Sequence, residues 1–424
     1  MYKPRMTASN RVVVYGTMPE AGNYDSARSN VLRSGRNTQL PARPGKHRCL
    51  AGLTILLITL ALTAGTTGCE PTLSCLEIRN WHDLHAIRDN LGGCYLLMND
   101  LNSTTAGYKE LASVTADDGK GWQPIGTSDG PFTGSFDGQG HEIRDMFVHR
   151  PDEYLVGLFG AVDMGGVIQN VKILDANVAG EWAVGCLVGE NCGEVRNSYC
   201  GGVVTGEDSV GGMVGRNGGT VADCYSTTSV AGRWDVGGLV GSNEWPGTII
   251  NSYSASSVRG EWASGGLAGS NLGGTVARSY STGTVVGEDY VGGLVGDNQG
   301  EVSDCYSIAS VVGQWYVGGL VGANDSPGVL NRCYSTGDVG GLSFVGGLVG
   351  SNWATVTNSF WNVETSEMND SDGGTGRSTA EMNDIATYVN AGWNIAAVAF
   401  GQTNPQYVWN IVSGQTHPFL SWQV

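Results

Sequence analysis

The stretch VGGLVGSNEWPGTIINSYSASSVRGEW, residues 236–262, contains one full unit of a repeat that dominates this 424-residue chain. Its opening phrase occurs eight times, at steps of 29, 26, 26, 28, 27, 26 and 28 residues. Such regularity is typical of a solenoid, in which each unit packs on its neighbours. The copies are LVGLFG at 155, VGCLVG at 184, VGGMVG at 210, VGGLVG at 236, SGGLAG at 264, and VGGLVG at 291, 317 and 345.

The composition of one unit indicates the kind of solenoid. Two or three β-prone segments of about four to six residues alternate with Gly, Asn and Ser. One unit cannot bury its own apolar face, whereas stacked coils align equivalent residues about 4.8 Å apart around a shared core. Helical repeats need longer amphipathic stretches, and a propeller blade needs about 40 residues. We therefore predict an all-β, right-handed parallel β-helix (β-solenoid) of about eight coils of 26–29 residues.

Two residue types recur in register with the phrase. An asparagine follows every copy but the first, which predicts a stacked amide ladder at a turn; the set is Asn191, Asn217, Asn243, Asn271, Asn298, Asn324 and Asn352. The 67 glycines predict close backbone approach and positive φ at the corners. Whether Leu239 or Val240 points into the core stays open, because both positions are apolar in every copy.

The repeat phrases resemble those of a known family. The patterns GGLVGxN and NSYSTG, represented here by GGLVGSN at 237–243 and NSYSAS at 251–256, are similar to the GLUG-motif repeat family. The flanking phrases WQPIG from Trp122, FTGSFDGQGHEI from Phe132, GGTGRSTAEM from Gly373 and HPFLSW from His417 are similar too. The resemblance implies an exported bacterial or archaeal surface protein, adhesin-like or scaffold in role, and supplies no catalytic residues.

The N-terminal region predicts export. The basic residues 46–48 precede an apolar run at 53–62, and small residues follow up to Cys69, which is the order of a secretory signal. Thr67-Gly68-Cys69 resembles a lipobox, so Cys69 is the expected lipidation site; cleavage near Ala64 is the alternative. The protein is then expected at the cell surface, lipid-anchored at Cys69, or secreted.

The chain divides into four predicted parts, with caps on both ends of the solenoid. They are an N-terminal extension and signal peptide (1–69), a cap with lead-in coils (70–154), the repeat solenoid (155–361) and a C-terminal cap (362–424). In the first cap, Trp81, Leu84, Ile87 and Leu91 predict a short helix before a strand at 95–98. In the second, the capping box that begins at Ser378 predicts a helix ending near Gly392.

The cysteines indicate one disulfide and several packing positions. Cys75 and Cys94 are the pair that we expect to be bonded. Cys224, Cys305 and Cys333 stand directly before Tyr-Ser, where other units have serine, and this exchange predicts small buried side chains.

The residues that could serve catalysis or bind metal favour a protein that is not an enzyme and needs no cofactor. The H-E-x-x-H zinc motif begins at His141-Glu142 but has Asp145 in place of its second histidine, and no histidine occurs between 150 and 416. Weak Ca²⁺ binding is conceivable at six acidic corner residues: Glu181, Glu207, Asp208, Glu261, Glu288 and Asp289. The alternative function is a β-helix polysaccharide lyase or glycoside hydrolase, for which the acidic residues without the repeat period are candidates: Asp117, Asp118, Asp129 and Asp137.

The net charge of the chain limits the classes of partner that it can bind. Residues 70–424 contain 14 Lys and Arg against 38 Asp and Glu, a formal charge of −24. Such a surface repels nucleic acid and anionic lipid, so membrane contact is expected only through the N-terminal lipid.

Aromatic residues recur at the acidic corner. Aromatic platforms there are candidates for binding a surface glycan or protein: Trp182, Trp234, Trp262, Tyr290 and Trp315. Stacking predicts that Trp234 and Trp262 lie about 5 Å apart along the axis, and Trp182 and Trp234 about 10 Å apart. The alternative interpretation is that these rings fold back and shield the edge of the coil.

Overall fold

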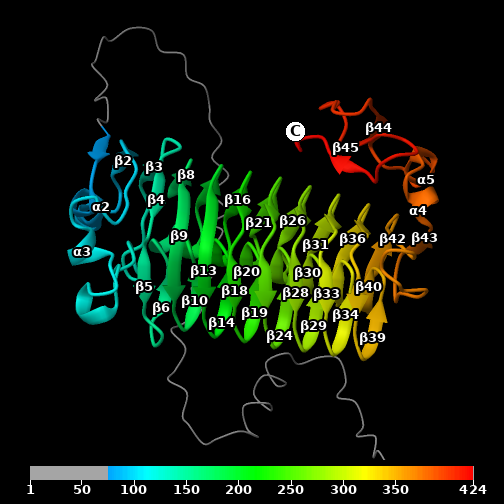
Figure 1. Ribbon diagram of the computed structural model, residues 1–424, viewed down its shortest axis with the longest axis horizontal. Coiled ribbons are helices and arrows are strands. Elements are labelled where there is room, and N and C mark those ends of the chain that lie inside the picture. The colour runs from blue at the N-terminus through cyan, green and yellow to red at the C-terminus, as the bar shows by residue number, and fades with distance from the viewer. Residues whose placement is uncertain (1–74, 424) are drawn as a thin grey trace, which may run out of the picture. The chain divides into compact units, whose positions relative to one another are not determined.

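The computed structural model describes residues 75–423 and shows a parallel β-solenoid with short helices near both ends. Figure 1 shows its coils stacked side by side along the long axis. The predicted all-β parallel fold is therefore confirmed. The signal segment, the cleavage position near Ala64 and the lipidation site Cys69 lie outside the described residues.

Most coils contain five short strands rather than the two or three that the sequence predicted. The coil that begins at Trp234 comprises β19 (Trp234–Gly237), β20 (Val240–Glu244), β21 (Thr248–Ile250), β22 (Tyr253–Ser254) and β23 (Ser257–Arg259). The strands are short because a turn follows every two to five residues. Equivalent strands of successive coils pair in parallel, so each strand position builds a sheet that runs the length of the solenoid.

The first two sheets contain the repeat phrase and have eight strands each. The corner sheet comprises β6 (Tyr154–Val156), β10 (Trp182–Gly185), β14 (Asp208–Gly211), β19, β24 (Trp262–Gly265), β29 (Asp289–Gly292), β34 (Trp315–Gly318) and β39 (Ser343–Gly346). The asparagine sheet comprises β7 (Phe159–Val162), β11 (Val188–Asn191), β15 (Val214–Asn217), β20, β25 (Ala268–Leu272), β30 (Val295–Asn298), β35 (Val321–Asn324) and β40 (Val349–Asn352).

The third sheet has 11 strands and includes the N-terminal cap. It comprises β1 (Leu76–Ile78), β2 (Cys94–Leu97), β3 (Ser135–Asp137), β8 (Val167–Gln169), β12 (Glu194–Arg196), β16 (Thr220–Ala222), β21, β26 (Thr275–Ala277), β31 (Glu301–Ser303), β36 (Val329–Asn331) and β41 (Thr355–Thr357).

The fourth sheet, here called the tyrosine sheet, has 16 strands because most coils contribute two. It comprises β4 (Glu142–Arg144), β5 (Phe147–His149), β9 (Lys172–Ala179), β13 (Tyr199–Thr205), β17 (Tyr225–Ser226), β18 (Ser229–Ala231), β22, β23, β27 (Tyr280–Ser281), β28 (Thr284–Val286), β32 (Tyr306–Ser307), β33 (Ser310–Val312), β37 (Tyr334–Ser335), β38 (Val339–Gly340), β42 (Phe360–Asn362) and β43 (Thr375–Arg377).

The repeat phrase forms the corner between the first two sheets. Leu239 and Val240 are both fully buried, which resolves the open choice between them. Both can face inward because the chain turns between β19 and β20, so the alternation of a straight strand does not apply. Their backbone N–H groups both donate to the carbonyl oxygen of Leu267 in the next coil, at 2.9 and 3.0 Å. The register also pairs Val184 with Val156, so the first copy of the phrase starts one residue later than the sequence suggested.

The glycines of the phrase serve close approach, whereas the predicted positive φ occurs at glycines outside it, such as Gly273 (φ 77°) and Gly283 (φ 92°). A Cβ on Gly237 would lie 1.9 Å from the carbonyl oxygen of Val240, and one on Gly238 would lie 2.1 Å from that of Gly266. Residues other than glycine also hold left-handed positions at the corners, among them Asp235 (φ 50°) and Asn251 (φ 49°). Asparagine and aspartate tolerate this conformation better than most residues.

The predicted amide ladder is present. Six hydrogen bonds of 2.8 Å run from each asparagine Nδ2 to the Oδ1 of its counterpart in the next coil, from Asn191 to Asn352. The ladder is buried up to Asn324, so each amide satisfies its neighbour where water cannot reach. These asparagines are structural.

The N-terminal cap matches its prediction closely. It contains α2 (Trp81–His85), the 3₁₀ turn η1 (Ala86–Asp89), α3 (Tyr108–Leu111) and η2 (Asp117–Gly119). Trp81, Leu84 and Ile87 are fully buried, and Cys75 is disulfide-bonded to Cys94. Within residues 75–423, no helix is long and apolar enough to cross a bilayer.

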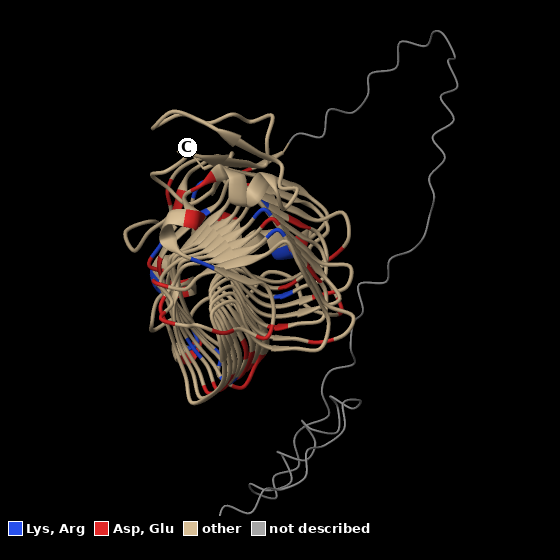
Figure 2. Ribbon diagram, turned by 90° about the vertical axis from the view of Figure 1, so that its right-hand side faces the viewer, with Lys and Arg blue, Asp and Glu red and all other residues tan. Residues whose placement is uncertain are grey.

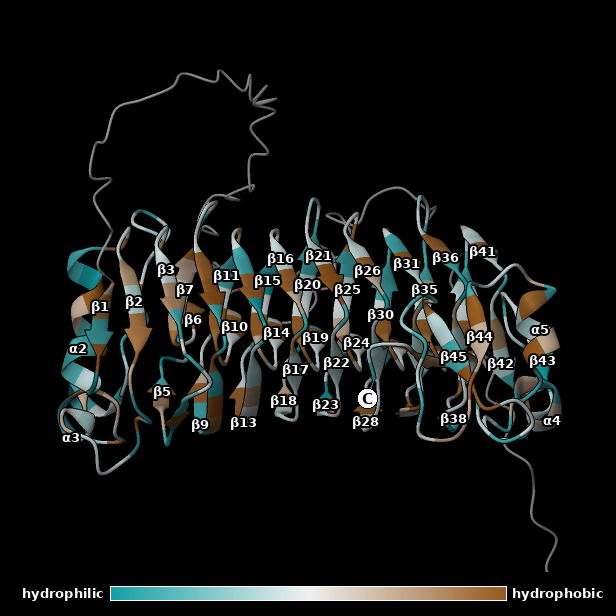
Figure 3. Ribbon diagram, turned by 90° about the horizontal axis from the view of Figure 1, so that it is seen from above, coloured by the Kyte–Doolittle hydropathy of each residue, from teal (hydrophilic) through white to brown (hydrophobic). Residues whose placement is uncertain are grey.

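The C-terminal part differs from its prediction. The capping box at Ser378 opens α4 (Thr379–Met382), but the helix stops there and Asp384 caps a second one, α5 (Ile385–Val389). The chain then forms β44 (Ile395–Ala397), β45 (Trp409–Ile411) and β46 (Phe419–Leu420). Figures 1 and 3 show this segment turning back from the end of the solenoid and lying along its side. Residues 393–423, here called the C-terminal strap, therefore cover a side face and not the end alone.

Candidate binding surfaces

The corner sheet brings four of the five predicted aromatic residues into one column. Trp182, Trp234, Trp262 and Trp315 occupy the first position of their strands, with Asp208 and Asp289 between them and Ser343 at the end. Trp234 pairs directly with Trp262, and Asp208 separates Trp182 from Trp234, as the period predicted. This set is the corner column.

Tyr290 lies outside that column, which corrects its predicted place in a single stripe. It follows Asp289 by one residue and has a positive φ of 56°. Its ring contacts Trp262, at 4.6 Å between centroids, and stacks on Tyr316 at 4.9 Å. Tyr316 stacks in turn on Phe344, at 4.9 Å. The prediction missed Tyr316. The repeat phrase could have revealed it, because its first valine directly follows Tyr290, Tyr316 and Phe344.

Exposure of the corner aromatics increases toward the C-terminal end. Trp315 is 46% exposed and Phe344 is 45% exposed, whereas Trp182, Trp234, Trp262 and Tyr290 are half-buried. Arginines cover two of the half-buried indoles: Arg233 lies 4.2 Å above Trp234, and Arg216 lies 5.6 Å from Trp182. The corner is thus an interrupted aromatic ribbon, with polar residues between rings and open faces near its C-terminal end.

The acidic residues of the corner crowd one another. Burial, followed by the nearby charge of Glu207, raises the pKa of Glu181 above its usual value. Burial, followed by Glu288, does the same for Asp289. Arg233 relieves the crowding locally, since its Nε lies 2.8 Å from Glu261. Figure 2 shows acidic residues on the turns of the coils.

Two of the four acidic residues considered for catalysis, Asp117 and Asp137, are held by side chains of other residues. Asp117 pairs with the buried Arg150 at 2.5 Å, while Asp137 accepts hydrogen bonds from Gln169 and Asn170 at 2.8 and 2.9 Å. Within residues 75–423, no group of three or more His, Cys, Asp or Glu side chains is placed to hold a metal ion. Cys224, Cys305 and Cys333 are buried in the core, as predicted.

A second aromatic column, which the sequence reading did not single out, lies in the tyrosine sheet. Its rings stack at 4.5–5.0 Å, and from Tyr225 to Tyr334 successive planes differ by only 2–4°. This tyrosine ladder comprises Tyr199, Tyr225, Tyr253, Tyr280, Tyr306, Tyr334 and Phe360. The Tyr-Ser pair that recurs along the repeat could have predicted this column.

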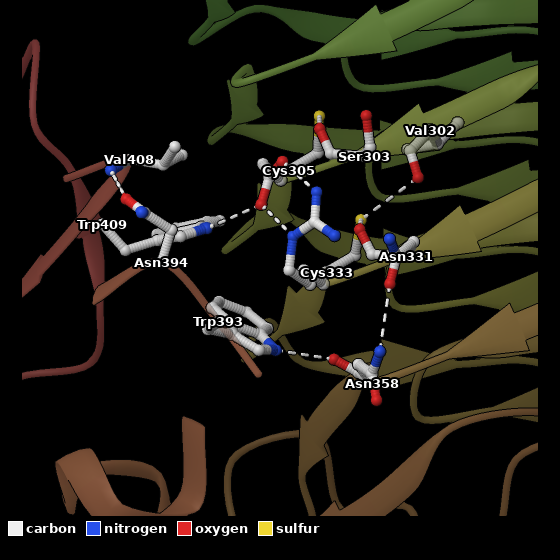
Figure 4. Close-up of polar contacts among 12 residues, drawn as sticks. Val302, Ser303, Cys305, Asn331, Cys333, Asn358, Trp393, Asn394, Val408 and Trp409 are labelled. Atoms are coloured by element: carbon white, nitrogen blue, oxygen red, sulfur yellow. Dashed lines mark hydrogen bonds and ion pairs between the residues drawn. The ribbon is translucent and has the colours of Figure 1, made fainter. Parts of the chain in front are cut away.

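The C-terminal strap covers the later part of this ladder. Trp422 contacts Tyr280 at 5.7 Å between centroids, Trp409 contacts Tyr334 at 5.8 Å, and Trp393 contacts Phe360 at 6.1 Å. Each of the three indole N–H groups donates to a residue two positions before a ladder ring: to the carbonyl oxygen of Arg278, to Asp304 Oδ1 and to the carbonyl oxygen of Asn358. Figure 4 shows Trp393 and Trp409 in this arrangement.

Comparison with known proteins supports the repeat assignment. Residues 260–286 match the GLUG motif, which confirms the resemblance seen in the repeat phrases. A 150-residue stretch is 38% identical to halomucin of Haloquadratum walsbyi, covering 34% of this chain and 2% of halomucin. A 91-residue stretch is 33% identical to a protein of Evansella cellulosilytica named "Putative Gly-rich membrane protein", covering 21% of this chain and 10% of that protein. This chain thus spans a small part of either relative.

One solved structure is similar over most of its length. It is the crystal structure of a "putative immunoglobulin A1 protease" from Bacteroides ovatus, with 21% identity and a TM-score of 0.45 over 82% of this chain and 93% of that chain. A likeness at this level carries no argument about function.

Proposed function

We propose that this protein is a non-catalytic surface scaffold, an adhesin-like β-solenoid that binds an extended polymer along its corner. The observation that carries the proposal is the corner column, in which four tryptophans share one strand position over the seven coils from Trp182 to Ser343. A linear array of rings suits a glycan or an extended polypeptide better than a small molecule, because its contacts repeat along a line.

The position at the cell surface is the second part of the proposal. The basic, apolar and small-residue segments that end at Cys69 support export, and one of the two relatives is named as a membrane protein. Changing Cys69→Ala should move the protein from the membrane fraction to the soluble fraction if a lipid on this cysteine anchors it. Unchanged fractionation would favour cleavage near Ala64.

Binding at the corner is tested by removing two adjacent rings. Trp234→Ala combined with Trp262→Ala should weaken the binding of a partner found by pull-down or on a glycan array. The expected loss of binding free energy is about 1–3 kcal/mol, if each ring is a modest hot spot. Because these rings are only half-buried, thermal stability should fall less than on removal of a fully buried tryptophan. A large loss of stability with unchanged binding would show instead that the tryptophans only protect the edge of the coil.

A further inference from the structure

The tyrosine ladder has an open end that the C-terminal strap does not reach. Trp422 is the strap residue nearest this end, where it contacts Tyr253 at 6.4 Å between centroids. Beyond it, Tyr199 and Tyr225 border a groove of about 450 Å³, together with Asp137, Asn170, Asn197 and Lys172. The groove is thus continuous with the interface between the ladder and the strap.

The strap shows what this face of the solenoid accepts. Each strap tryptophan places its ring against the ladder and directs its N–H to the turn two residues before the ladder position, as at Arg278 and Asp304. In the open groove, Asn170 and Asn197 occupy the corresponding turn positions, with φ of 56° and 46°. A ligand with an apolar ring face and polar groups at its rim would repeat this arrangement.

We propose that this groove binds an uncharged glycan, with a pyranose ring stacked on the outer face of Tyr199, the last ring of the ladder, and its hydroxyl groups bonded to Asp137, Asn197 and Lys172. The C–H face of a sugar packs on an aromatic ring, and its hydroxyls both donate and accept. The side chains in the groove match that chemistry, because carboxylate and amide oxygens accept and the ammonium group of Lys172 donates. One negative and one positive side chain favour a neutral ligand.

The polar side chains of the groove are held in place before any ligand binds. Asp137 Oδ1 accepts from Asn170 Nδ2 at 2.9 Å, and its Oδ2 accepts from Gln169 Nε2 at 2.8 Å. Although burial raises the pKa of Asp137, the hydrogen bonds from Asn170, Gln139 and Gln169 lower it below its usual value, so the group stays an ionised acceptor. The hydroxyl of Tyr199 is fixed by Thr227 Oγ1 at 2.6 Å. Preorganisation of this kind reduces the entropy lost on binding.

The test is affinity electrophoresis of the full chain in native gels that contain hydroxyethylcellulose, laminarin or galactomannan, with polygalacturonate as the charged comparator. At least one neutral polysaccharide should retard the protein. Tyr199→Val with Tyr225→Val removes both rings but introduces valine, which also favours strands, and should weaken binding by about tenfold or more. If that variant does not fold, Asp137→Asn with Lys172→Gln keeps the rings and should also weaken binding.

The matched control is Trp353→Ala, which removes a 73% exposed ring outside the groove and the corner column and should leave this retardation unchanged. The corner pair Trp234→Ala with Trp262→Ala is run beside it to report any binding at the corner. Absence of retardation by every neutral polysaccharide, or equal retardation of the groove variants, would overturn the proposal. Loss of retardation only in the corner pair would assign glycan binding to the corner and overturn the groove. Self-association of the full chain in sedimentation velocity, lost with the Tyr199 and Tyr225 changes, would assign the groove to a second copy of this chain and also overturn it.

Discussion

The tyrosine ladder and the corner column have the same coil spacing, but their rings are arranged differently. In the ladder every coil from β13 to β37 supplies a tyrosine, and the rings from Tyr225 to Tyr334 stack almost flat, within 2–4° of parallel. In the corner column aspartate and serine interrupt the series of tryptophans, and Trp262 contacts Tyr290 beside the column with its ring tilted by 45°.

Coil spacing brings rings together but does not decide whether they remain accessible. The strap buries Tyr306 and Tyr334, whereas nothing within residues 75–423 covers Trp315 to that extent. Both columns share one register, so changes that break the register should damage both, and changes to one column should be separable.

The largest effect is expected from breaking the shared register. Deleting the whole unit 236–263 should preserve the fold, because the coils on either side present equivalent strands to each other. Deleting only 236–249 should abolish cooperative unfolding, because the next strand then meets a partner from a different sheet. Circular dichroism with thermal unfolding measures both. Equal tolerance of the two deletions would contradict a common register.

The next effect compares a covered tryptophan with an exposed one. Trp409→Ala should destabilise the protein by about 3–5 kcal/mol, because Trp409 is fully buried between the strap and the ladder. Trp315→Ala, the matched change in the corner column, should cost less than about 1 kcal/mol, because that ring is 46% exposed. Urea denaturation measures both. Similar losses would mean that the two columns are equally covered.

A smaller effect is expected at alkaline pH, where the ladder can ionise and the corner column, which contains no tyrosine, cannot. Burial, followed by its neighbours Tyr280 and Tyr225, raises the pKa of Tyr253 from 10.0 to about 12. The unfolded chain therefore loses this proton first, and stability that is present below pH 10 is lost as the pH rises toward 12. Tyr253→Phe should make the decline of the free energy of unfolding with pH shallower. Unfolding is measured from about pH 9 upward, because a free tyrosine has a pKa of about 10. Trp234→Phe should leave the slope of this decline unchanged, and a slope insensitive to Tyr253→Phe would argue against a packed ladder.

The smallest effect is expected for the charged residues on the corner. Arg233 contacts Glu261 at 2.8 Å and covers Trp234, but both charged partners are partly exposed. Arg233→Ala should therefore change stability by only about 0.5 kcal/mol, and added salt should reduce the difference. A loss above about 2 kcal/mol would show that the corner depends on this ion pair for its structure.

Features that repeat with the coil could be predicted from the residues alone. The eight copies of the phrase predicted parallel stacking, the asparagines predicted the amide ladder, and the exchange of serine for Cys224, Cys305 and Cys333 predicted their burial. In a solenoid each residue meets its own counterpart one coil away, so periodicity in sequence translates directly into contact in space.

Features that depend on local geometry or non-repeating contacts needed the tertiary structure. The positive φ of Tyr290 and its equivalents turns the chain at the corner, which separates Tyr290 from the tryptophan column and stacks it on Tyr316. The strap joins residues far apart in the chain, with Trp409 bonded to Asp304 across 105 positions and Trp422 to Arg278 across 144. Such contacts do not repeat along the sequence, so its periodicity cannot predict them. The repeat therefore encodes the two aromatic columns, whereas the folding back of a non-repetitive segment decides which rings are covered.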